Sequence, residues 1–250
     1  MTAPQLSSLP VDLADPVRAR VGLIALATDM TTEVDFARVL VPQGIAVHTT
    51  RIPFANPVTP ATLAAMEPDI TEAASLILPD EPLAAVVYSC TSASVVIGDD
   101  RVRAAIAAGK PGATAITPIS AGTAGLKALG ARRISLLTPY DAQTTQPMAD
   151  LFEAEGFDLM GVTCMGLTDD RQMARITPDT LARHAKAAVA AGSDALFLSC
   201  TAVGAVAAIE QIERAVGVPV VSSNLATLWA VLRATGNAAR AVTCALMDQP

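Results

Sequence analysis

Aromatic residues are scarce in this chain: Phe, Trp and Tyr make up 3% of its 250 residues. Proteins that bind single-stranded nucleic acid stack the bases on aromatic rings, so this scarcity argues against that class. Positively charged residues are also few: 24 Asp and Glu outnumber 17 Lys and Arg and leave a formal net charge of −7. Phosphate backbones need a basic surface, and we therefore expect no nucleic-acid partner.

Long apolar runs and targeting signals are absent as well. The longest apolar stretch, over residues 185–209, is interrupted by Gly192, Ser193 and Asp194, so it does not predict a membrane span. The first 20 residues do not have the basic and apolar segments of a signal peptide. These observations predict a cytoplasmic protein that does not bind a membrane.

Signals for bound groups are equally lacking. The chain has four cysteines but no CxxC pair, and its two histidines lie in no metal-ligand spacing. No P-loop or GxGxxG motif follows a predicted strand. We therefore expect no metal and no cofactor.

The residues that are abundant indicate an α/β protein. Ala, Val, Leu and Ile dominate the 52% of hydrophobic residues, a mixture typical of parallel sheets covered by helices. Short apolar runs alternate with segments of helical pattern, which is the signature of βαβ units. The expected strands are 21–27, 45–51, 85–89, 113–117, 134–137, 157–164, 195–199 and 218–222. The expected helices are 32–41, 60–78, 99–108, 120–129, 143–155, 178–191, 206–216 and 226–235.

This order restarts near residue 131. We therefore predict two pseudo-symmetric, Rossmann-like halves, residues 20–130 and 131–240, each a parallel sheet flanked by helices. Ligands of such sheets bind beyond the carboxyl ends of the strands. The active site is accordingly expected in the cleft between the halves.

The clearest internal repeat is Ser-Cys-Thr, which ends the apolar runs before Cys90 and Cys200. The two cysteines are 200 − 90 = 110 residues apart, one in each predicted half. A helix-like stretch follows each turn, and helix N-termini stabilise thiolates and carboxylates. A single buried cysteine is more often inert, but the matched pair predicts two catalytic cysteines. The neighbouring residues expected to bind substrate are Thr91, Ser92, Thr201 and Ala202.

Three more residues are weaker candidates for substrate binding. Asp29 follows the first strand and would bind substrate, orient a cysteine or simply cap a helix. Tyr140 follows the first strand of the second half and would bond to a substrate carboxylate or pack in a turn. Asp170, in a predicted loop, would approach the site or lie in solvent. Cys164 falls within a predicted strand, and we interpret it as a core residue.

Several of these segments carry a family resemblance. VGLIALATDMTTE, YSCTSASVVIG, LFLSCTAVGAVAAIEQIE and GVPVVSSN resemble the cofactor-independent aspartate/glutamate racemase superfamily over about residues 20–236. The nearest branch holds maleate cis-trans isomerases, arylmalonate decarboxylases and racemase-like proteins of ectoine utilization. The resemblance implies an enzyme that racemises or isomerises a small carboxylic or amino acid through two facing cysteines. Homodimers or higher homo-oligomers are common in the superfamily.

The resemblance leaves several activities open. Two thiols suit a racemase, in which one removes an α-proton and the other returns one, or a maleate isomerase, in which Cys90 attacks the double bond. The decarboxylases use one cysteine, which corresponds to Cys200. Maleate isomerases carry asparagine where this chain has Asp29 and Asp170, a difference that favours a substrate with a cationic group. A non-catalytic small-ligand binding module is the remaining alternative.

Overall fold

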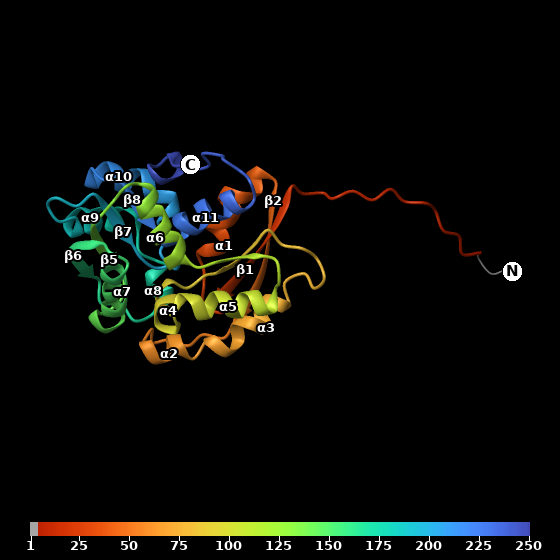
Figure 1. Cartoon of the computed structure of the whole chain (residues 1–250), viewed down its shortest axis with the longest axis horizontal. Coiled ribbons are helices and arrows are strands. Elements are labelled where there is room, and N and C mark those ends of the chain that lie inside the picture. The colour runs from red at the N-terminus through yellow and green to blue at the C-terminus, as the bar shows by residue number, and fades with distance from the viewer. Residues whose placement is uncertain (1–4) are drawn as a thin grey trace.

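The computed structural model describes residues 5–250 and contains two parallel four-stranded sheets (Figure 1). The strand order is β2-β1-β3-β4 in the first sheet and β6-β5-β7-β8 in the second, so the second repeats the first. The strands are β1 Ala19–Leu26, β2 Ile45–Ile52, β3 Ala85–Tyr88, β4 Thr114–Ile116, β5 Arg133–Thr138, β6 Asp158–Cys164, β7 Ala195–Leu198 and β8 Val220–Ser222. The predicted fold class is confirmed.

The register places equivalent chain segments at the centre of each sheet. Ile24 of β1 pairs with Tyr88 of β3, and Leu137 of β5 pairs with Leu198 of β7. Each Ser-Cys-Thr turn therefore follows a central strand, β3 or β7, and lies next to the carboxyl end of its neighbour, β1 or β5. The boundary predicted near residue 131 lies between β4 and β5.

Most helices lie near their predicted positions, with ends shifted by a few residues. They are α1 Thr32–Leu40, α5 Asp99–Gly109, α6 Pro118–Ala128, α7 Ala142–Ala154, α9 Pro178–Ala188, α10 Ile209–Val216 and α11 Ser223–Ala234. Helix α11 is buried over most of its length and packs against both α6 and α1. It thereby joins elements that belong to different parts of the sequence.

The prediction of one long helix over residues 60–78 is wrong. The segment forms α2 Pro60–Ala64, a 3-10 turn Glu67–Asp69 and α3 Ile70–Ser75. Pro68 lies within the turn, and proline has no backbone N–H for an internal helical hydrogen bond. Proline therefore explains why a continuous helical pattern becomes two short helices.

Two short helices lie beside the cysteines: the helix expected after Cys90 is present, whereas the other was not predicted. Helix α4, Thr91–Ile97, begins directly after Cys90 and ends at Gly98, whose φ of 101° separates it from α5. Helix α8, Asp170–Met173, occupies the segment expected to be a loop. Both are too short to show a clear apolar periodicity in the sequence.

The edges of the molecule differ from its buried centre. Strand β6 is the outer strand of its sheet, and Cys164 at its end is exposed, so the prediction that Cys164 is a core residue is wrong. Residues 5–17 form an arm that projects away from the body (Figure 1). Within residues 5–250, no helix is long and apolar enough to cross a membrane.

Candidate functional site

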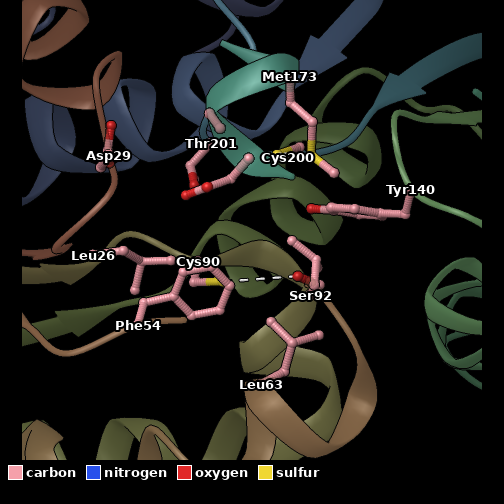
Figure 2. A pocket seen from close by; sticks show the side chains of 13 residues that line it. Leu26, Asp29, Phe54, Leu63, Cys90, Ser92, Tyr140, Met173, Cys200 and Thr201 are labelled. Atoms are coloured by element: carbon pink, nitrogen blue, oxygen red, sulfur yellow. Dashed lines mark hydrogen bonds between the residues drawn. The ribbon is translucent and has the colours of Figure 1, made fainter. Parts of the chain in front are cut away.

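A small cavity of about 20 Å³ lies at the carboxyl ends of the central strands, between the two cysteine turns. Figure 2 shows Cys90 on one side of it and Cys200 on the other, with the Tyr140 hydroxyl directed between them. The lining residues are Leu26, Asp29, Phe54, Val58, Leu63, Cys90, Ser92, Tyr140, Asp170, Met173, Cys200, Thr201 and Ala202. The structure thus brings together every predicted site residue except Thr91.

Cys90 is the N-cap residue of α4 and has an extended backbone, with φ −152° and ψ 110°. Its side chain is nearly buried, and its Sγ lies 3.7 Å from the Ser92 hydroxyl (Figure 2). Burial raises the pKa of the Cys90 thiol to about 11, although the Ala93 amide and the Ser92 hydroxyl oppose the shift. The pKa of the Cys90 thiol is therefore raised overall, although two neighbouring donors favour the thiolate.

Cys200 has a different backbone. Its φ is 91°, in the left-handed region that non-glycine residues rarely occupy, and such strain is typical of functional sites. A turn and not a helix follows it, because α10 begins only at Ile209, so the expected helix N-terminus at Cys200 is wrong. Burial raises the pKa of the Cys200 thiol to about 12, and the Tyr140 hydroxyl opposes this most strongly.

One hydrogen bond connects the two cysteine turns directly, and two others join them to the segment after β1. The Thr201 hydroxyl donates to the Ser89 carbonyl at 3.1 Å, immediately before Cys90. The Thr31 hydroxyl donates to the Ala202 carbonyl at 2.7 Å, and the hydroxyls of Thr32 and Ser89 lie 2.8 Å apart. The chain around one cysteine is thus held by the chain around the other.

Asp29 serves mainly as a helix cap. Its Oδ1 accepts from the backbone amides of Thr31 and Thr32, at 2.8 and 2.9 Å, at the beginning of α1. In Figure 2 its carboxylate lies well away from the cysteine sulfurs. Capping accounts for Oδ1, whereas Oδ2 accepts from the Ser89 hydroxyl at 3.4 Å beside Cys90, and the residue lines the cavity.

The remaining predicted residues divide between the cavity and its support. Ser92, Thr201 and Ala202 line the cavity, whereas the buried Thr91 hydroxyl donates to Ser223 at 2.7 Å. Tyr140 is buried at the cavity wall, and burial raises the pKa of its phenol well above the usual value. Its hydroxyl is consequently a stable donor in this site.

Asp170 is a buried acid whose negative charge raises the pKa of both Cys90 and Cys200. Its carboxylate accepts from the Thr28 hydroxyl and from the Asn56 amide, the latter at 3.0 Å. The Asp170 backbone amide in turn donates to Asn56 Oδ1 at 3.2 Å. These bonds fix the carboxylate at the cavity wall.

Sequence reasoning missed the apolar wall. Leu26, Phe54, Val58, Leu63 and Met173 enclose the cavity, and most of them come from the segment between β2 and α3 or from α8. No motif identifies them, because their role depends on how loops fold over the strand ends. Across residues 5–250, no group of three His, Cys, Asp or Glu side chains is arranged to hold a metal ion.

A buried polar pair, Asp35 and Asn224, contacts the Cys200 turn outside the cavity lining. Asn224 at the beginning of α11 donates to the Thr201 carbonyl at 2.9 Å and to Asp35 of α1 at 3.0 Å. Burial raises the pKa of Asp35 to about 6, while Asn224 and Arg38 oppose the shift. Asn224 ends the GVPVVSSN segment noted in the sequence, whereas Asp35 lies in no such segment and was not predicted.

Comparison with known proteins agrees with this architecture. The family model of arylmalonate decarboxylase matches residues 56–247, which is most of the chain. The chain belongs to the arylmalonate decarboxylase family. Within curated members, it is 37% identical to the arylmalonate decarboxylase of Bordetella bronchiseptica over 119 residues, covering 47% of this chain and 50% of that one. It is 29% identical to the maleate isomerase of Nocardia farcinica, covering 86% and 89%.

Solved relatives of the family share the fold. The maleate isomerase of Pseudomonas putida S16, solved with maleate, has a TM-score of 0.84 and 25% identity, with 92% of this chain and 98% of that chain covered. The Nocardia farcinica maleate cis-trans isomerase, solved with a covalently bound succinylcysteine intermediate, has a TM-score of 0.83, 26% identity and the same coverage. Both relatives are enzymes, and these similarities support an enzymatic function here.

Proposed function

We propose that this protein is a cofactor-independent isomerase that converts a small cis-unsaturated carboxylic acid of the maleate type to its trans isomer. The observation that carries the proposal is the pair of cysteines on opposite sides of one cavity (Figure 2). The curated maleate isomerases are matched over 86–87% of this chain, whereas the Bordetella decarboxylase is matched over 47% of it. The relatives described above give no support to racemase chemistry or to a role in ectoine utilization.

In the proposed reaction, Cys90 is the nucleophile. Its thiolate forms a bond from Sγ to one alkene carbon, and the electron pair of the double bond moves onto the carbon beside the carboxylate. The Cys200 thiol donates a proton to that carbon, which gives a saturated cysteine adduct. Rotation about the new single bond, return of the proton to Cys200 and cleavage of the carbon–sulfur bond release the trans acid.

The environment of each thiol suits this division of roles. The pKa of Cys90 is the lower of the two, about 11 against about 12, and the Ala93 amide and Ser92 hydroxyl lie beside its sulfur. Cys200 is more fully protonated at rest and is therefore the sulfur that holds a proton to donate. Tyr140, buried between them, is positioned to donate a hydrogen bond to substrate oxygen or to the Cys200 thiolate.

The proposal is tested by proton NMR of the purified protein with maleate and with its monoamide. Appearance of the trans vinylic signals, lost in Cys90→Ser and Cys200→Ser but retained in the exposed-site control Cys164→Ser, would support it. If neither acid is converted, the isomerase proposal fails.

A racemase is the second candidate, because two facing thiols also serve two-base proton exchange. In D₂O, deuterium entering the α-position of an amino acid such as aspartate or glutamate, without any cis-trans conversion, would favour it. Release of CO₂ from a methyl-phenylmalonate that needs only Cys200 would instead favour decarboxylation. Ligand binding that is indifferent to both cysteines would favour the binding module.

A further inference from the structure

The charges around the cavity are unbalanced. Among its lining residues, all within the described part of the chain, there are two carboxylates, Asp29 and Asp170, and no Lys, Arg or His. The Asp29 carboxylate already accepts two backbone amides at the beginning of α1. Asp170 therefore determines which charge is favourable for the ligand group that lies beside it in the cavity.

Asp170 has only neutral partners. Thr28 and Asn56 donate to its two oxygens, and no ion pair found among residues 5–250 includes it. The adjacent Asp169 differs, because Arg171 Nη2 lies 2.7 Å from its Oδ2. A buried carboxylate without a cation repels a second carboxylate strongly, since little water screens the two charges.

We infer that Asp170 is a specificity-determining residue, and that the substrate is a monoanion carrying a hydrogen-bond donor, a carboxamide or ammonium group, where maleate carries its second carboxylate. The inference rests on the proposed function and narrows its substrate class. The donor binds the Asp170 carboxylate, whose Thr28 and Asn56 contacts leave lone pairs free. The substrate carboxylate occupies the other end, near the Thr201 and Ala202 backbone.

The structure supports this placement in a second way. The Asp170 charge disfavours both thiolates. A donor group bound to Asp170 offsets that charge, so the correct substrate favours ionisation of the cysteines when it binds. A dianion adds negative charge to the same space and opposes ionisation.

The experiment compares maleate with maleamate, its monoamide, which has nearly the same shape but one negative charge fewer. Calorimetric Kd values and NMR turnover are measured for wild type, Asp170→Asn and the matched control Asp169→Asn. We expect wild type to prefer maleamate by about tenfold or more. Asp170→Asn should shift the ratio at least tenfold toward maleate, and Asp169→Asn should not change it.

Equal or tighter binding of maleate by wild type would overturn the inference, even if Asp170→Asn fails to fold. An unchanged ratio in a folded Asp170→Asn would overturn it as well, since Asp170 would then not select between the two ligands. These results leave the proposed function standing if cis-trans conversion occurs. Conversely, a Kd preference for maleamate without any conversion would uphold the charge selection and reject the isomerase proposal.

Discussion

The turn at Cys90 begins a helix, whereas the turn at Cys200, with the same Ser-Cys-Thr sequence, has a strained backbone and is followed by irregular chain. Both cysteines follow central strands in sheets of identical order. The difference shows that the repeat conserves the position of sulfur and not its surroundings. Ser92 and a helical amide accompany one sulfur, and Tyr140 and Met173 accompany the other.

The largest expected effect comes from removing each sulfur in turn. Cys90→Ser and Cys200→Ser should each lower turnover by about a thousandfold or more, because an alcohol ionises far less readily than a thiol. Turnover is measured by NMR, with Cys164→Ser as the control. Normal turnover in Cys90→Ser would mean that only the Cys200 turn is catalytic and that the two turns are not functional equivalents.

Alkylation compares the same two sulfurs without substrate. At pH 8, pKa values of about 11 and about 12 leave roughly one thiolate in a thousand at Cys90 and fewer at Cys200. Iodoacetamide should therefore modify the exposed Cys164 at least about a hundredfold faster, with Cys90 ahead of Cys200, as peptide mass spectrometry would reveal. Faster labelling of Cys200 would reverse the proposed roles.

The Asp35–Asn224 pair tests how the two halves are held together. The folded-state pKa of Asp35 is raised from 3.8 to about 6, so its stabilising neutral form is present below pH 4 and lost as the pH rises through 6. Between pH 4 and pH 7 the unfolding free energy of wild type should fall by up to about 3 kcal/mol relative to Asp35→Asn. Urea denaturation at both pH values measures this difference. Parallel pH dependence in the two proteins would contradict it.

The smallest expected effects come from the hydroxyl beside each sulfur. Tyr140→Phe removes the donor that most lowers the pKa of Cys200 and should reduce kcat about tenfold, with the pH profile displaced upward. Ser92→Ala removes a 3.7 Å contact to Cys90 and should reduce kcat only about threefold. Equal losses would indicate that the two hydroxyls support their thiols to the same extent.

The sequence predicted the fold well because the central strands contain short apolar runs that alternate with helical segments. It also placed the two cysteine turns correctly, since a parallel sheet brings the ends of its central strands to one edge. It could not predict α8 or the Phe54–Leu63 wall, because these depend on chain segments that cross from one half to the other. The conformation of Cys200 was equally inaccessible, since Cys90, in the same tripeptide, has an ordinary extended backbone.

The hydrogen bonds that join the two turns also bear on how the protein can unfold. Thr201 holds the carbonyl before Cys90, and Thr31 holds the carbonyl after Thr201. Opening the chain around either cysteine therefore breaks bonds on both sides of the cavity. We expect the backbone amides near both cysteines to exchange with solvent deuterium at the same rate, in one cooperative opening. The two sides of the candidate site would then unfold together.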